Sequence, residues 1–187
     1  DKTVHLLGGE ELALTSDRFI LVNTVRGPVI DNEQLKQWKN KHAEPAIILD
    51  VWENEPEPDM ELLSVTDIAT PHIAGYSFDG KVNGTEMIYK SLCECFGIAE
   101  QVSVSELKPK VSNNVLEVNL GDYDSKQELL AYLTGRAYDI VGDDGRMRGV
   151  LSKPASERGG YFDKLRKEYP VRREFGNYMV KLTGCAS

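Results

Sequence analysis

Three apolar runs in the first half of the chain are each followed by a side chain that could take part in catalysis. Arg26 comes shortly after the first run, Asp50 lies near the end of the second and Glu55 after it, and His72 follows the third. An arginine can grip an anion through paired hydrogen bonds, and a histidine can exchange a proton with a hydroxyl or carbonyl group. A carboxylate beside the histidine would orient its ring. These residue types predict a site that binds an anion and transfers a proton.

The apolar runs are predicted to be parallel strands whose carboxyl ends bring these side chains together. The runs are Phe19 to Asn23, Ala46 to Trp52 and Val65 to Pro71, and the first is expected to be buried on both faces. Residues 31–42 begin with a good N-cap, Asp31, and are predicted to form a helix. Strand, helix, strand, loop, strand is typical of an α/β fold, in which functional groups gather outside the carboxyl ends of the strands.

Each of these side chains also has a simpler structural interpretation. Arg26 alone would more often form an ion pair or cap a loop. Glu55 lies in the acidic stretch ENEPEPD, where most carboxylates are merely solvated, and His72 could equally be a satisfied loop residue. Their joint occurrence after the strands of one α/β unit favours one site over three coincidences.

The second half of the chain changes pattern. One long helix is predicted from Ser77 to about Gly97, and its apolar stripe consists of Met87, Ile88, Leu92, Cys95 and Phe96. Beyond it we predict a strand at 115–120, a helix at 125–138, a polar loop at 143–149 and a closing strand near 177–184. We therefore predict two domains, residues 1–97 and a small α+β domain at residues 98–187.

Composition narrows the classes of partner and the compartment. The 22 Lys and Arg against 30 Asp and Glu give a net charge of −8, which disfavours nucleic acid and anionic membrane surfaces. No apolar run approaches the roughly 20 residues of a membrane-spanning helix, so a cytoplasmic protein is expected. The spacing of Cys93, Cys95 and Cys185 predicts packed thiols and no metal site.

Three ordered blocks resemble the D-2-hydroxyacid dehydrogenases. These are ILVNTVRGPVID, LDVWENEP and TPHIAGY. The resemblance implies the second half of a Rossmann-like, parallel-sheet NAD-binding domain, followed by a small α+β dimerisation domain. Later blocks, GTEMIYKS and FDKLRKEYPVRREF, resemble a branch of the family that acts on a phosphorylated 2-hydroxy acid. A homodimer that uses NAD is therefore expected.

The same resemblance implies roles for individual residues. Arg26 would bind the substrate and act as an electrophile, His72 would be the acid/base, and Glu55 would be the partner of the histidine. The implied ligand contacts are Thr24, Arg26, Asp50 and Gly75 for NAD, and Arg26 and Tyr76 for the substrate.

The phosphate-binding loop of the family, Gly-x-Gly-x-x-Gly, is not found ahead of these blocks. The nearest stretch, LLGGEE, lacks the required spacing. We therefore expect the chain to be a fragment of a longer enzyme that binds NAD poorly alone and leaves apolar strand edges and faces exposed.

Other functions remain open at this level. The chain could be an inactive association module, with residues 161–175 either in an interface or on a solvated amphipathic helix. It could also belong to a dehydrogenase for another D-2-hydroxy acid. A third hypothesis, sugar-phosphate binding, rests on charge alone and uses Lys164, Arg166, Lys167, Arg172 and Arg173.

Overall fold

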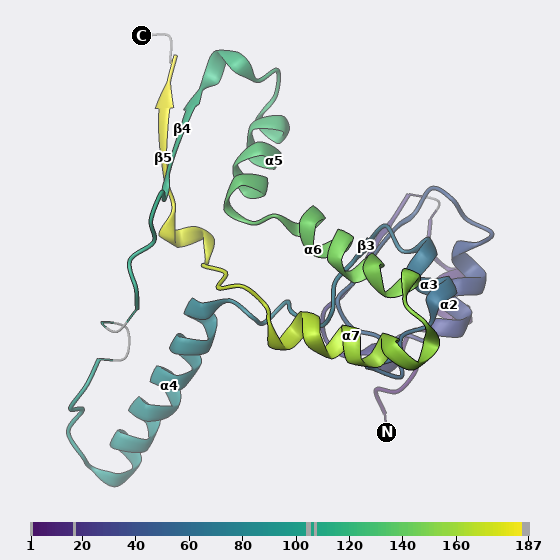
Figure 1. The fold of residues 1–187 in the computed structure, drawn as a ribbon, viewed down its shortest axis with the longest axis horizontal. Coiled ribbons are helices and arrows are strands. Elements are labelled where there is room, and N and C mark those ends of the chain that lie inside the picture. Colours follow the sequence, from purple (N-terminus) through teal and green to yellow (C-terminus); the bar gives the residue numbers. More distant parts are fainter. Residues whose placement is uncertain (1, 17, 104–105, 107, 185–187) are drawn as a thin grey trace. The chain divides into compact units, whose positions relative to one another are not determined.

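The computed structural model of the chain describes residues 2–16, 18–103, 106 and 108–184. It contains two compact units, each built from two stretches of sequence. The first unit combines Asp1–Ala74 with Val141–Tyr169, and the second combines Gly75–Ile140 with Pro170–Ser187. Figure 1 shows the elements of both units along the chain. The compact units do not follow the predicted division at residues 97 and 98, because each unit combines two separate stretches of sequence. The division into two domains stays a prediction.

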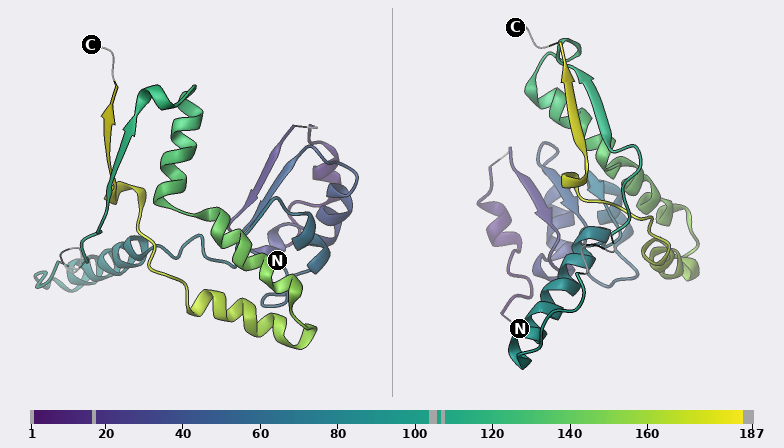
Figure 2. Two further views of the ribbon diagram at one scale, coloured as in Figure 1. Left: turned by 45° about the horizontal axis from the view of Figure 1, so that its top comes forward. Right: turned by 90° about the vertical axis from the view of Figure 1, so that its left-hand side faces the viewer.

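The first unit is organised around a three-stranded parallel sheet. Its strands are β1 (Ile20–Asn23), β2 (Ala46–Leu49) and β3 (Ile68–Ala69), in the order β1-β2-β3 (Figure 2). Asn23 pairs with Leu49, and Leu49 pairs with Ala69, so the three carboxyl ends lie at one edge. The predicted α/β fold with parallel strands is confirmed.

One face of this sheet carries the core of the first unit. The buried strand residues Leu21, Ile47 and Leu49 lie on the same face, because Leu21 pairs with Ile47. Around them pack residues from α1 (Gly9–Ala13), α2 (Asn32–Lys39), α3 (Met60–Val65), α6 (Ile140–Arg148), η4 (Gly149–Ser152) and α7 (Ala155–Lys167). These helices supply Leu12, Leu35, Trp38, Leu62, Leu63, Met147, Val150 and Phe162 to a single hydrophobic cluster.

The expectation that β1 is buried on both faces is wrong. Ile20 and Val22 are exposed, whereas Leu21 and Asn23 between them are buried. The helical residues of the hydrophobic cluster join the Leu21 face, so the opposite face of β1 remains open. This agrees with the prediction that apolar faces of the sheet are left uncovered in this chain.

The helix predicted for residues 31–42 is α2, and it ends at Lys39. The Asp31 side chain accepts a hydrogen bond of 2.9 Å from the Gln34 N–H, which confirms that Asp31 is the N-cap. Leu35 and Trp38 are buried in the core, and the ring of Trp38 stacks on His42 at 4.6 Å between centroids. The apolar spacing and the cap together fix the start and the buried face of this helix.

The predicted polar loop at 143–149 is wrong, because residues up to Arg148 belong to α6. Met147 is fully buried in the core. The Asp144 carboxylate accepts a 2.8 Å hydrogen bond from the Ala69 N–H, and Arg148 donates to the Thr66 carbonyl at 2.6 Å. These polar residues therefore bind the end of α3 and the last residue of β3, which a surface loop would not do.

The second unit contains the long helix and a two-stranded ribbon. Helix α4 (Phe78–Phe96) begins at the N-cap Ser77 and ends at Gly97, whose φ of 62° is left-handed. The strands β4 (Val115–Asn119) and β5 (Met179–Thr183) pair in parallel, side by side in Figure 2. The remaining elements are η3 (Leu120–Asp122), α5 (Lys126–Ala137) and η5 (Phe175–Asn177). The predicted long helix, the helix at 125–138 and both strands are confirmed.

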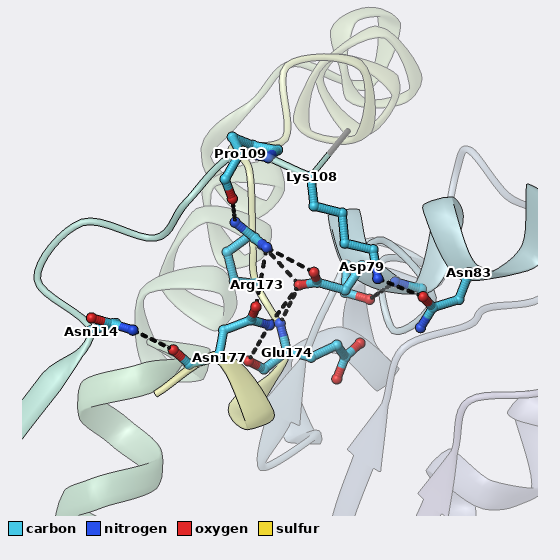
Figure 3. Close-up of polar contacts among 10 residues, drawn as sticks. Asp79, Asn83, Lys108, Pro109, Asn114, Arg173, Glu174 and Asn177 are labelled. Atoms are coloured by element: carbon cyan, nitrogen blue, oxygen red, sulfur yellow. Dashed lines mark hydrogen bonds and ion pairs between the residues drawn. The ribbon is translucent and has the colours of Figure 1, made fainter. Parts of the chain in front are cut away.

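A buried ion pair joins the start of α4 to the carboxyl-terminal segment (Figure 3). Arg173 donates to both oxygens of Asp79 at 2.9 Å. The same carboxylate accepts from the Glu174 N–H at 2.8 Å and from the Asn177 side chain at 3.0 Å. These hydrogen bonds lower the pKa of Asp79 to about 2, with the Arg173 guanidinium the largest cause.

The cysteines correct one expectation. Cys93 is buried, as predicted, but Cys95 is exposed on α4, and Cys185 lies outside the described residues. Across the described stretches, no group of three or more His, Cys, Asp or Glu side chains is arranged to hold a metal ion. In the same stretches, no helix is both long enough and apolar enough to cross a membrane.

Candidate functional site

A histidine and a glutamate form a pair beyond the carboxyl ends of β2 and β3. The Nδ1 atom of His72 lies 2.7 Å from Oε2 of Glu55, and the side chains are 28% and 21% exposed. The other oxygen of Glu55 accepts a 2.9 Å hydrogen bond from the Trp52 N–H. Because Glu55 engages Nδ1, the Nε2 atom of His72 is the one available for proton exchange with a ligand.

The loop that carries His72 is held by Asp50. The Asp50 carboxylate accepts from the Thr70 hydroxyl at 2.6 Å, from the Ile73 N–H at 2.8 Å and from the Ala74 N–H at 2.9 Å. The backbone carbonyl of Asp50 accepts from the His72 N–H at 2.7 Å. Asp50 is buried and thus fixes a loop in which His72 takes a left-handed φ of 57°.

Trp52 connects the two loops of the pair and was not singled out from the sequence. Its indole N–H donates to the Thr70 carbonyl at 3.0 Å, and its backbone N–H donates to Glu55. The side chain is buried. A tryptophan at the end of an apolar run, immediately before a polar, proline-rich stretch, is the sequence signal that could have identified it, since a large aromatic there needs a buried partner.

The loop after β1 carries Arg26 and touches the loop after β2. The Asn23 side chain shapes it, donating to the Arg26 carbonyl at 3.0 Å and accepting from the Val25 N–H at 3.1 Å. Gly27 is buried against the backbone of Trp52, where a methyl group would overlap the Trp52 carbonyl. This close approach brings the Arg26 backbone next to the segment that leads to Glu55.

The Arg26 side chain is exposed, and its one contact within the described residues is a 2.7 Å hydrogen bond from Nη1 to the Val25 carbonyl. The structure therefore brings Glu55 and His72 together, while the guanidinium of Arg26 contacts neither of them. An arginine with most of its N–H donors exposed at this edge can take an anionic ligand.

The remaining predicted site residues are divided between the two units, with Thr24 in the first and Gly75 and Tyr76 in the second. Thr24 is exposed immediately after β1, at the carboxyl edge of the sheet. Gly75 and Tyr76 belong to the second unit, where the Lys81 ammonium lies 4.2 Å from the centre of the Tyr76 ring. The cofactor and substrate contacts assigned to these residues stay predictions.

The residues at the carboxyl edge fit one end of a dinucleotide. Asp50 uses about three of its four acceptor positions on Thr70, Ile73 and Ala74, which leaves it able to accept one hydrogen bond from a ligand amide. Thr24 offers an exposed hydroxyl at the same edge. The chain holds no glycine-rich phosphate loop, so the fit concerns the nicotinamide end alone.

Two family models match separate parts of the chain. Residues 1–74 match the D-isomer specific 2-hydroxyacid dehydrogenase, NAD binding domain, and residues 110–187 match a domain of unknown function, DUF3410. The first match covers Arg26, Glu55 and His72. The second covers α5, α6, α7 and both strands of the ribbon.

Curated relatives match nearly the entire chain. An erythronate-4-phosphate dehydrogenase from Cellvibrio japonicus is 43% identical over 185 residues, covering 97% of this chain and 48% of the relative. One from Pseudomonas putida is 42% identical, covering 97% of this chain and 47% of the relative. The chain thus spans about half the length of the curated relatives it matches.

Solved structures match more partially. A glyoxylate reductase is 33% identical, with a TM-score of 0.39 over 42% of this chain and 24% of its own. A D-lactate dehydrogenase from Aquifex aeolicus, complexed with NAD and lactic acid, is 24% identical, with a TM-score of 0.42 over 51% of this chain and 34% of its own. These likenesses are too partial to support an argument about function.

Proposed function

We propose, from the homology of this chain to the carboxyl-terminal part of erythronate-4-phosphate dehydrogenases, that it carries the acid/base pair of an NAD-dependent dehydrogenase. Its residues 1–74 match the NAD-binding domain of the D-2-hydroxyacid dehydrogenases. The proposed reaction oxidises 4-phospho-D-erythronate to 2-oxo-3-hydroxy-4-phosphobutanoate, a cytoplasmic step towards pyridoxal phosphate. The observation that carries the proposal is the 2.7 Å contact between His72 and Glu55 at the carboxyl edge of the sheet.

In this reaction His72 removes the proton of the substrate C2 hydroxyl through Nε2. Glu55 accepts the hydrogen bond from Nδ1 and stabilises the ring once it carries both protons. Trp52 fixes Glu55 through its backbone N–H, and Asp50 fixes the His72 loop. The pair therefore reaches the substrate with its orientation already set, which lowers the entropic part of the barrier.

Arg26 binds the substrate carboxylate and the oxygen that becomes the carbonyl. Its guanidinium is permanently charged, and only one of its N–H donors is engaged within the described chain. Charge that develops on the C2 oxygen is stabilised by such a donor. Tyr76, next to the His72 loop in sequence, is proposed to contact the substrate as well.

NAD, when bound, supplies the hydride acceptor. Asp50 is proposed to accept a hydrogen bond from the nicotinamide carboxamide, and Thr24 and Gly75 are proposed to line the same end of the cofactor. No residue of this chain is proposed to bind the cofactor phosphates, because its sequence lacks the glycine-rich loop.

The direct test is NADH formation by the full-length polypeptide that carries this chain. With NAD and 4-phosphoerythronate, absorbance at the NADH band is expected to rise, and unphosphorylated erythronate is expected to react far more slowly. Faster turnover of another D-2-hydroxy acid would identify that acid as the substrate instead. If no D-2-hydroxy acid is turned over, the proposal is contradicted.

A second proposed role, homodimer formation, is favoured by the surface of α4. The apolar stripe predicted from the sequence is exposed: Met87 is 69%, Ile88 73%, Leu92 53% and Phe96 67% accessible. Such a stripe on a long helix costs solvation free energy unless another surface covers it. A second copy of this chain is the proposed partner, and the association could accompany catalysis.

The sugar-phosphate hypothesis has less support. The Arg173 side chain is 9% exposed and paired with Asp79, and Arg172 lies over the Tyr138 ring at 4.6 Å. Lys164 lies 3.9 Å from the Glu168 carboxylate. Because these cations already contact groups of the chain, we do not propose a phosphate site there.

A further inference from the structure

His5 lies beside the turn that follows Arg26. Its N–H donates to the Pro28 carbonyl at 2.7 Å, and two residues later the Leu7 N–H donates to the Val29 carbonyl at 3.1 Å. The φ of His5 is 52°, a left-handed value that histidine, asparagine and aspartate adopt more readily than most residues. The imidazole lies beside the carboxylates of Asp31 and Glu53.

Both nitrogens of the His5 ring face a carboxylate. Nε2 lies 2.5 Å from Oε1 of Glu53, and Nδ1 lies 3.3 Å from Oδ2 of Asp31. Ionised carboxylates only accept hydrogen bonds, so the ring satisfies both contacts when each nitrogen carries a proton. The His5 side chain is 45% exposed, whereas both carboxylates are mostly buried. One ring therefore bridges two carboxylates from different segments.

The bridged carboxylates are themselves structural. Asp31 is the N-cap of α2. The second oxygen of Glu53 accepts from the Asn32 N–H at 3.3 Å, and the Glu53 N–H donates to the Asn32 side chain at 3.2 Å. Asn32 is buried. Paired hydrogen bonds thus join the start of α2 to the segment after Trp52. His5 contacts a carboxylate on each side of this junction, Asp31 and Glu53.

We propose that His5 is a positioning residue of the dehydrogenase site. Glu53 is two residues before Glu55, so fixing Glu53 fixes the loop that presents Glu55 to His72. Through the Pro28 carbonyl, His5 also holds the turn that follows Arg26. A single side chain and its backbone thereby tie together the two loops that carry Arg26 and Glu55. This inference rests on the proposed function, since it assigns His5 a part in the same reaction.

The test compares substitutions at His5 in the full-length polypeptide. His5→Asn tolerates the left-handed backbone but cannot span both carboxylates, so kcat is expected to fall about 10- to 100-fold while KM for NAD stays nearly constant. His5→Arg restores donors for two carboxylates and is expected to recover much of kcat. His42→Asn, whose ring stacks on Trp38, is the matched control and should leave kcat unchanged.

A second readout separates this inference from the reaction itself. Hydrogen exchange at the Glu53 amide should quicken in His5→Asn and in Glu53→Gln, and the double variant should be no faster than the quicker single variant. If exchange quickens as expected but the protein has no dehydrogenase activity, the positioning role in catalysis fails together with the proposed function. The contact between His5 and Glu53 would still be established. An unchanged kcat in His5→Asn would overturn the inference. So would exchange at the Glu53 amide that is faster in the double variant than in either single variant.

Discussion

At Gly27 the loop that carries Arg26 packs directly against the backbone of Trp52. Gly27 is buried, and a side chain at this position would overlap the backbone of Trp52. Backbone atoms of a buried loop segment cannot move aside as the end of a flexible side chain can. The distance between the loops that carry Arg26 and Glu55 therefore depends on the absence of a side chain at Gly27.

Gly27→Ala is expected to destabilise the chain by about 2 kcal/mol or more and to reduce activity, because the overlap must be relieved by shifting one loop. The matched control is Gly84→Ala in α4, where the added methyl group meets no atom within 4 Å. That variant should gain about 0.5–1 kcal/mol from helix propensity. Chemical denaturation of both variants measures these changes, and equal stabilities would contradict the loop contact.

The chemistry-bearing residues could be selected from the sequence, but the residues that position them could not. Arg26, Glu55 and His72 have side chains suited to catalysis, and they follow apolar runs. Gly27 has an ordinary residue type whose importance depends on which loops touch. Trp52 stands out as a large aromatic beside a polar stretch, but its partners Glu55 and Thr70 cannot be read from its position. That information is absent from local pattern and enters only with the fold.

At the scale of elements, the buried Asp79–Arg173 pair controls how α4 begins. Asp79 lies in the first turn of α4 and accepts hydrogen bonds from Arg173, Glu174 and Asn177 (Figure 3). A carboxylate at a helix N-terminus is also favoured by the helix dipole. The pair therefore attaches the carboxyl-terminal segment to the long helix within the second unit.

The lowered pKa of Asp79 predicts a pH-dependent stability. A carboxylate whose folded pKa is about 2, below its ordinary value of 3.8, stabilises the fold above pH 4 by about 2 kcal/mol. This contribution should be lost as the pH falls from about 4 to 2. Carbon-13 NMR of the Asp79 carboxyl group should show the low pKa, and in Arg173→Gln the pKa should return towards 3.8. Titration near 3.8 in both proteins would refute the assignment.

The strands and the helices with clear caps were predictable, whereas α6 was not. Asp31 and Ser77 accept hydrogen bonds from Gln34 and Gly80, as capping side chains do. The charged and glycine-containing residues of α6 resemble a loop by composition. Their partners are the ends of α3 and β3, far away in sequence, so local pattern gave no sign of them.

At the scale of the whole molecule, the chain leaves apolar surfaces open on both units. Ile20 and Val22 are exposed on β1, and Ile88 and Phe96 are exposed on α4. The first surface lies on the sheet of the first unit, and this chain spans about half the length of the curated relatives it matches. The second is the apolar stripe of α4, which is the surface proposed for a second copy.

Ile88→Glu and Phe96→Glu are expected to weaken self-association about 10-fold or more, because each places a charge where a large apolar side chain would be buried. Ser91→Glu, also exposed on α4, is the matched control. Sedimentation of the chain over a range of concentrations measures the effect. A wild-type chain that remains monomeric throughout would contradict the dimer.

The most direct measurement of the central claim is the turnover of His72→Asn in the full-length polypeptide. Asparagine tolerates the left-handed backbone at this position, so the loop should keep its shape while the imidazole is lost. NADH formation from 4-phosphoerythronate is predicted to fall about 100- to 10,000-fold, with binding of NAD retained. Turnover equal to that of the wild type would contradict the assignment of His72 as the acid/base.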